Sequence, residues 1–171
     1  SLMNSPAAVK SVRGAQRPRI ELVPKAAYVE SGPDAVAYCA AAGLVLDPWQ
    51  VYVLENSLGE RLDYNYSARE VAIVVPRQQG TSAILEARVI AGLFLFGERI
   101  LYTAHLLETA REIFNRIIGI IRSTPELEEQ VQQIYTGNTQ SKVVLKNGRE
   151  LQIGARTPDQ GRGKSFEVLI L

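Results

Sequence analysis

The chain has 171 residues, enough for one domain with a sizeable buried core. Its apolar content of 46% and charged content of 22% are those of an ordinary globular protein. The net charge of +1 excludes a bulk attraction to nucleic acid, and the single cysteine excludes an internal disulfide.

The first 18 residues are polar and basic and show no hydrophobic period, which predicts a mobile arm over 1–18. We interpret Ser1-Leu2, which precede Met3, as a cloning-vector remnant. The basic side chains of the arm could touch DNA, although a solvated tail is the simpler interpretation.

Residues 19–70 predict a helical subregion. Gly32-Pro33-Asp34 opens a short alanine-rich helix that ends near Gly43. Cys39 lies among the small residues of this helix, so we expect a buried thiol in a protein from a reducing compartment.

A second helix is predicted from Asp47 to about Gly59. Asp47 is a good N-cap, and Pro48 is pre-organised for the first helical position. Residues 60–68 then predict a loop or a short edge strand.

The segment from Val71 to Ser82 predicts a buried strand over Val71–Val75, a tight polar turn and a helix from Ser82 to about Phe96. This is the order of a phosphate-binding loop, in which backbone N–H groups and the helix dipole attract anionic oxygens. The usual pattern is G-x-x-x-x-G-K-[ST]. Gly80 and Ser82 match it, whereas Val75 stands at the first glycine and Thr81 at the lysine.

The following segments continue the alternation of strands and helices. They are a strand over Arg99–His105, a helix over Glu108–Arg122 and a helix from Thr124 to about Ile134, followed by a hairpin of 142–146 and 150–154. Asn147-Gly148 predicts a type I′ turn in this hairpin. After a polar loop at 156–164, an apolar strand over 166–171 ends the sequence, so we expect a fragment.

This order of elements is that of an α/β fold and resembles a RecA-like P-loop NTPase core, with a mainly parallel sheet flanked by helices and one inserted hairpin. The motifs resemble the N-terminal ATPase part of tailed-phage terminase large subunits over about 46–171. They are Asp47-Pro-Trp-Gln50, Val75-Pro-Arg-Gln-Gln-Gly80, Ile84-Leu-Glu-Ala with Ala91-Gly-Leu-Phe-Leu-Phe-Gly-Glu98, Tyr102-Thr-Ala-His105, Thr109-Ala-x-x-x-Phe114, Asn147-Gly-x-Glu150 and Ala155-Arg-Thr-x-x-x-Gly-Arg-Gly163.

The resemblance implies an ATPase that uses ATP and Mg²⁺ to drive double-stranded DNA into a capsid. It implies a ring of identical subunits, a portal protein, a terminase small subunit and a nuclease domain further along. A partial ATPase core would then occupy 71–171. The family's Walker B acids would follow Leu171, so we expect no hydrolysis by this chain alone.

The resemblance also implies the residues of the nucleotide site. Phosphates would contact Arg77, Gln78, Gln79, Gly80, Thr81 and Ser82, with the Ser82 hydroxyl on Mg²⁺. Arg77 is a hypothetical partial substitute for the absent lysine, although guanidinium geometry argues against full compensation. Gln50 would pair with the adenine edge, and Trp49 beside it either packs in the core or stacks on the base.

Two further places carry chemistry-bearing residues. His105, the only histidine, lies at the C-terminal end of a predicted strand but has no partners at catalytic or metal-ligand spacing, so we interpret it as positioning a loop. A glycine-flanked loop holds Arg156, Arg162 and Lys164. These side chains could contact DNA phosphates, and Arg162 could sense charge on a nucleotide. The alternative is a loop whose charges are simply solvated.

Two alternatives stay open: a helicase-like DNA-processing ATPase, and a degenerate module that binds nucleotide or DNA without hydrolysis. No apolar run approaches the ~20 residues of a membrane span, and no signal-peptide core is present. We therefore expect a soluble protein of the host cytoplasm.

Overall fold

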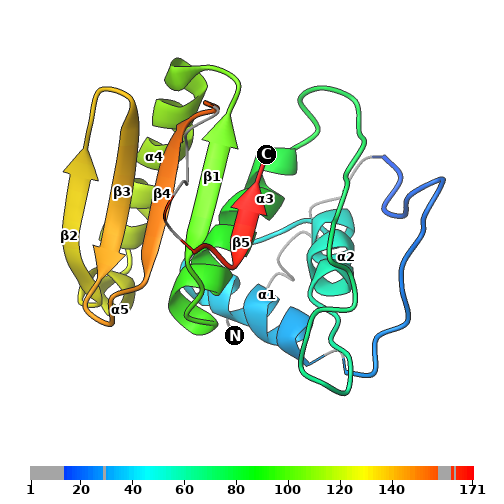
Figure 1. Ribbon diagram of the computed structural model, residues 1–171. Helices are drawn as coiled ribbons and strands as arrows, with labels where there is room; N and C mark the ends of the chain where they lie inside the picture. The colour runs from blue at the N-terminus through cyan, green and yellow to red at the C-terminus, as the bar shows by residue number, and fades with distance from the viewer. Residues whose placement is uncertain (1–13, 29, 158–162, 164) are drawn as a thin grey trace, which may run out of the picture.

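A mixed five-stranded sheet forms the centre of the computed structural model, which describes residues 14–28, 30–157, 163 and 165–171. The strand order is β2-β3-β4-β1-β5 (Figure 1). β1 (Ile100–Ala104) pairs in parallel with β4 (Glu150–Ala155) and β5 (Val168–Ile170). β3 (Gln140–Leu145) pairs antiparallel with β4 and with β2 (Val131–Thr136). The α/β class is confirmed, but the sheet is mixed rather than mainly parallel.

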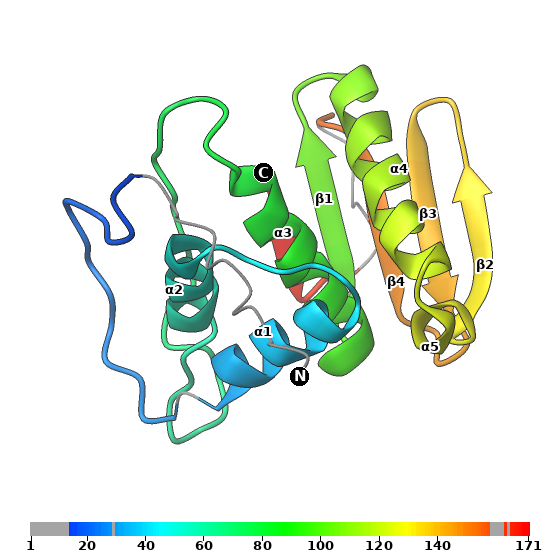
Figure 2. The same ribbon diagram turned by 180° about the vertical axis from the view of Figure 1, so that it is seen from behind.

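The longer helices cover one face of this sheet. Figures 1 and 2 show α3 (Thr81–Ile90) behind β1 and β5 and α4 (Leu107–Arg122) behind β1 and β4, with α1 (Ser31–Ala41) packed against α3. α2 (Pro48–Ser57) packs beside α1 and α3. The core lies between these helices and the sheet. Its largest fully buried side chains are Leu54, Leu58, Val89, Ile90, Leu93, Ile100, Ile117, Ile121, Leu127, Leu145, Leu151 and Ile153.

The best-predicted helix is α4. It covers the predicted range, and its apolar residues at helical spacing, Ala110, Ile113, Phe114, Ile117 and Ile121, are all buried. Apolar side chains at helical spacing produce a single stripe, and the sheet covers that stripe.

The helix that follows the polar turn changes its winding near its end. α3 passes directly into a π-helical segment, η1 (Ala91–Leu95), in which the Phe96 N–H donates to the Ala91 carbonyl at 2.9 Å. The predicted extent of Ser82–Phe96 is therefore confirmed, while the π-turn was not predicted.

The expected strand at Val71–Val75 is wrong. This stretch forms no strand and pairs with no other described segment, and Val71 and Val74 are 52% and 95% exposed. A run of β-branched residues favours extended backbone, but a strand also needs a neighbour for its N–H and C=O groups. Here the segment runs outside the sheet, beyond the β5 edge (Figure 1).

The expected helix from Thr124 to Ile134 is also wrong beyond its first turn. Pro125 begins α5 (Pro125–Glu128), a single turn, and the chain then enters β2. Val131, Ile134 and Tyr135 favour strand, and β3 supplies the antiparallel partner that decides the outcome.

The predicted hairpin forms with a different turn. Gly148 has a φ of +84°, whereas Asn147 has no positive φ, so the turn is not type I′. Gly148 N–H bonds to Leu145 O at 2.9 Å and Leu145 N–H to Arg149 O at 2.8 Å. This is a three-residue loop with a left-handed glycine.

The structure also bears on the predicted burial of Cys39 and on the predicted loop after α2. Cys39 is fully buried, and burial raises the pKa of its thiol to about 11. Residues 60–66 form a loop with isolated bridges from Glu60 to Tyr28 and to Tyr66. No helix among the described residues has the length and hydropathy needed to cross a bilayer.

Candidate functional site

The polar turn leads into α3 with an unusual backbone. Gln78 has a φ of +61° and Gly80 a φ of +90°, so two residues of the turn are left-handed. A left-handed residue other than glycine is uncommon, and alternation of this kind turns successive N–H groups toward one side. We call residues Arg77–Ser82 the phosphate turn. Its side chains are exposed except for Thr81, which is half-buried.

The N-terminus of α3 has no side-chain cap. Gly80 is its N-cap, the first turn holds no acidic residue, and Ala83 N–H bonds back to Gly80 O at 3.2 Å. Within the part of the chain that the structure describes, the N–H groups of Thr81 and Ser82 have no hydrogen-bond acceptor. Such amides, at the positive end of the helix dipole, are donors for an anion.

This helix start lies at a chemically favourable edge of the sheet. Figures 1 and 2 place it beside the carboxyl ends of β1 and β5. Open α/β sheets bind ligands outside the carboxyl ends of their parallel strands. The turn is therefore open to solvent at the edge where a ligand is expected.

Gln50 joins this turn to α2. Its carboxamide is buried; Oε1 accepts from Asp47 N–H at 2.7 Å, and Nε2 donates to Gly80 O at 2.8 Å. The structure thus brings Gln50 to the phosphate turn, whereas the resemblance implied a place beside the adenine. Both ends of the amide hold backbone groups, so in this geometry Gln50 supports the turn rather than presenting a free edge to a base.

Trp49 lies at the same helix start and is half-buried against the core. Its backbone N–H donates to Gln16 Oε1 at 3.2 Å, and the Arg17 guanidinium lies 3.9 Å from the ring centroid of Tyr52 on the same helix. The last residues of the expected solvated arm are therefore docked on α2, whereas residues 1–13 lie outside the described residues.

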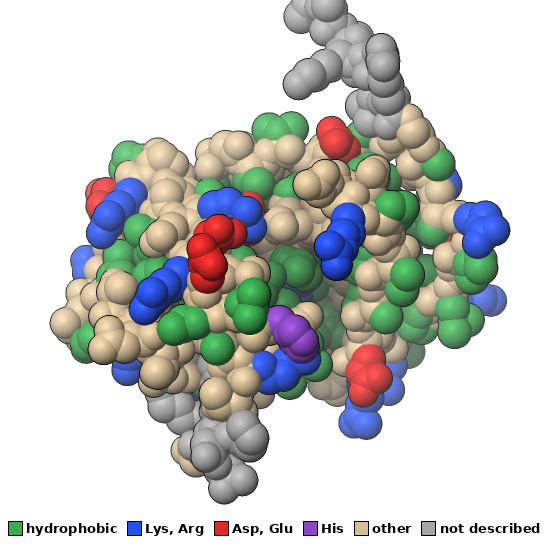
Figure 3. Space-filling model, turned by 90° about the horizontal axis from the view of Figure 1, so that it is seen from above, with side chains coloured by type: hydrophobic (Ala, Val, Ile, Leu, Met, Phe, Trp, Pro, Cys, Tyr) green, Lys and Arg blue, Asp and Glu red, His purple; other side chains and the backbone are tan. Residues whose placement is uncertain are grey.

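Two further polar residues gather at the same sheet edge. His105 is exposed directly after β1, and Arg156 follows β4. Arg156 Nε approaches Thr103 Oγ1 at 3.4 Å, while Thr103 Oγ1 approaches Ile170 O at 3.4 Å. Figure 3 looks onto this edge and shows the histidine beside Lys or Arg side chains and next to a hollow. Arg162 and Lys164, expected in the same loop, lie outside the described residues.

Sequence reasoning missed a buried polar cluster at the C-terminal end of α3, opposite the end that the turn precedes. Arg88 forms a two-pronged ion pair with Glu98 at 2.7 and 3.2 Å, and Tyr66 Oη donates to Glu98 at 2.6 Å. Burial and the Glu98 hydrogen bond both raise the pKa of Tyr66. The sequence cue for this pair was the presence of two opposite charges, Arg88 and Glu98, in an apolar stretch. They become partners because η1 folds Glu98 back over Gly92.

A second partly buried ion pair lies on the helical side, away from the turn. Glu86 is buried and pairs with Arg116 at 2.6 Å. The two residues border a shallow cavity of about 400 Å³ between α1, α3 and α4. Because Arg116 already neutralises Glu86, we assign this pair to the packing of α3 on α4.

The donors at the turn suit a polyphosphate better than a metal held by protein alone. Among the described residues, no three His, Cys, Asp or Glu side chains gather to hold an ion. Mg²⁺ would depend on the phosphates and on the exposed hydroxyl of Ser82. Free N–H groups and a nearby guanidinium, Arg77, fit the oxygens of a nucleotide phosphate.

Comparison with known proteins adds no identification. No protein-family model, no curated protein and no solved structure matches this chain.

Proposed function

We propose that this chain is the ATPase portion of a DNA-packaging motor of the phage terminase kind and that it binds Mg²⁺·ATP at the phosphate turn. The observation that carries the proposal is the pair of left-handed residues, Gln78 and Gly80, immediately before the uncapped start of α3. The motif order described above supplies the motor class. Double-stranded DNA, a small subunit, a portal protein and a ring of like subunits are then the proposed partners.

The turn itself accounts for binding by main-chain donors. The amides of Thr81 and Ser82 would take phosphate oxygens, and the Ser82 hydroxyl would enter the coordination of Mg²⁺. Arg77 supplies the nearest positive charge, because Thr81 occupies the lysine position of the usual loop. This chain alone should bind the nucleotide without hydrolysing it, since neither residues 77–82 nor the first turn of α3 include an Asp or Glu that could direct a water.

A direct test is calorimetric titration of the purified chain with Mg²⁺·ATP. We expect saturable binding that weakens by about 10- to 100-fold in Arg77→Ala, the range for a charge-assisted contact. Arg122→Ala, an equally exposed arginine in the last turn of α4, is the control and should leave affinity unchanged. Absence of binding by the unaltered chain would overturn the proposal.

A gain-of-function variant gives a sharper test. Thr81→Lys adds the missing cation and should tighten Mg²⁺·ATP binding by at least about 10-fold. Thr109→Lys makes the same change in the first turn of α4, where no such backbone turn precedes the helix. If both variants respond alike, the effect is general electrostatics and the turn is not the site.

A binding module without hydrolysis is the second candidate, and Thr81 is the observation that favours it. A module that has lost catalysis would bind ATP and ADP equally and gain nothing from Thr81→Lys. The motor assignment predicts instead that the added lysine favours ATP over ADP, because it would reach the terminal phosphates.

A further inference from the structure

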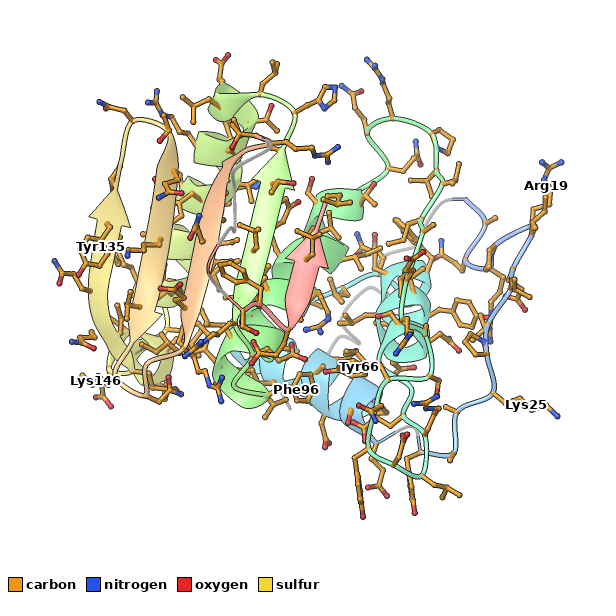
Figure 4. All side chains as sticks on the ribbon, viewed as in Figure 1. Arg19, Lys25, Tyr66, Phe96, Tyr135 and Lys146 are labelled. Carbon is orange, nitrogen blue, oxygen red and sulfur yellow. The ribbon has the colours of Figure 1, made fainter. Side chains whose placement is uncertain are left out.

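A short segment before the helices is fastened to α2 by three different contacts. We call residues Gln16–Glu21 the strap. Gln16 Oε1 accepts from Trp49 N–H at 3.2 Å, and Arg17 lies 3.9 Å from the Tyr52 ring centroid. Tyr52 Oη donates to Glu21 Oε2 at 2.6 Å. Figure 1 shows this segment running alongside α2, and Figure 4 shows Arg19 and Lys25 projecting away from it.

The strap reaches the first turn of α2, which is the part of that helix that holds the phosphate turn. Gln16 satisfies one of the N–H groups that a helix start leaves without a partner. The next residue along the helix is Gln50, whose amide is fixed between Asp47 N–H and Gly80 O. A continuous chain of hydrogen bonds and covalent neighbours therefore runs from the strap to Gly80.

Apart from Gln50, the segments on the N-terminal side of α3 offer the phosphate turn few contacts. The stretch before it, Val71–Val75, is unpaired within the described part of the chain, and Ile73 is its one side chain that packs against the core. Gln78 keeps a left-handed backbone that few residues adopt without support. Among the described residues, the bond from Gln50 is the one side-chain hydrogen bond made to the turn.

We propose that the strap is a positioning element for the phosphate turn, with Tyr52 and Gln16 as positioning residues that act through Gln50. This inference rests on the proposed nucleotide site. When the strap is docked, α2 holds Gly80 and the amides that follow it in the geometry for phosphate. When it detaches, the turn loosens and nucleotide affinity falls. By linkage, a nucleotide bound at the turn favours the docked strap by the same factor.

The test uses the full chain and its only tryptophan, Trp49, as the reporter. Tyr52→Phe removes the bond to Glu21. It should raise acrylamide quenching of Trp49 in the absence of nucleotide and weaken Mg²⁺·ATP binding by about 5-fold or more. Tyr135→Phe is the matched control, because Tyr135 Oη makes a similar bond to Gln133 Oε1 at 2.9 Å on the distant strand β2. Glu21→Gln keeps an acceptor for the Tyr52 hydroxyl and should leave Trp49 quenching and Mg²⁺·ATP affinity close to those of the unaltered chain.

Hydrogen exchange separates this inference from the proposed function. The amide of Ala83, whose N–H bonds to Gly80 O at 3.2 Å, should exchange faster in Tyr52→Phe than in the unaltered chain, with or without nucleotide. If the chain binds no nucleotide, the function fails while this readout still tests the strap. If Trp49 quenching rises but neither exchange nor affinity changes, or if Tyr135→Phe has the same effect, the strap does not position the turn.

Discussion

Gln50 Nε2 donates a 2.8 Å hydrogen bond to the carbonyl oxygen of Gly80, although the two residues are 30 positions apart. The same carbonyl accepts from Ala83 N–H at 3.2 Å, so both of its lone pairs are used at the start of α3. This contact joins the second helix to the phosphate turn, and among the described residues it is the one side-chain hydrogen bond made to the turn.

Replacing the donor should loosen the turn without disturbing α2. Gln50→Glu keeps the oxygen that accepts from Asp47 N–H but faces Gly80 O with a second acceptor. We expect the free energy of unfolding to fall by about 1 to 3 kcal/mol, the cost of losing a buried hydrogen-bond partner. Chemical denaturation measures this loss. Equal stability in Gln50→Glu would show that the bond contributes nothing.

Gly80→Ala should be more costly than an ordinary glycine replacement. A side chain is strained at a φ of +90°, and its Cβ would lie 2.9 Å from Gln50 Nε2. Gly43→Ala is the control, because Gly43 has a φ of +84° with no heavy atom near its Cβ position. We expect about 1 kcal/mol for Gly43→Ala and at least about 1 kcal/mol more for Gly80→Ala.

A double mutant identifies the source of that excess. If the clash with Gln50 causes it, Gly80→Ala should cost less in a Gln50→Ala background than alone, because the side chain in the way is gone. Strict additivity of the two losses in thermal or chemical unfolding would contradict the contact.

The buried cluster of Arg88, Glu98 and Tyr66 at the C-terminal end of α3 should be sensitive to its central carboxylate. The side chains of Arg88 and Glu98 are only 14% and 11% exposed. Glu98→Gln therefore leaves the Arg88 guanidinium without its counter-charge and with little water to solvate it. We expect a loss of about 3 kcal/mol in unfolding free energy. Asp63→Asn breaks the Arg61–Asp63 pair, which is 56% and 54% exposed, and should produce no measurable change.

Cys39 predicts an alkaline loss of stability. Burial raises the pKa of its thiol from 9.0 to about 11 in the folded protein, so above pH 9 the unfolded chain releases this proton first. The thiol's contribution is therefore complete below pH 9 and is lost as the pH rises toward 11, by up to about 2 to 3 kcal/mol. Unfolding curves of the parent and Cys39→Ala should diverge in this range. Parallel pH profiles would contradict the burial effect.

Much of the local structure could be predicted from the sequence. The apolar stripe of α4, the Asp47-Pro48 start of α2 and the buried strand β1 each carry their signal in neighbouring residues. The turn before α3 could also be predicted, because Gly80 and the hydroxyl residues after it mark the start of a helix. The sequence did not predict that Val71–Val75, the segment before this turn, stays outside the sheet.

Val71–Val75 and β2 show why. The first has the composition of a buried strand but finds no partner among the described residues, whereas Val131–Thr136 continues a helical start and becomes a strand because β3 lies beside it. The contact between Gln50 and Gly80 also depends on distant parts of the chain. The sequence indicated Gln50 as a functional residue, but it did not predict that its amide bonds to Gly80 O.

The sequence by itself determined which residues face inward in α4 and where a phosphate-binding backbone could form. Only the tertiary structure decided which strands exist and what holds the turn. The physical reason is that burial patterns are written along a segment, whereas backbone pairing and side-chain hydrogen bonds depend on a neighbour that folding brings from a distant part of the chain.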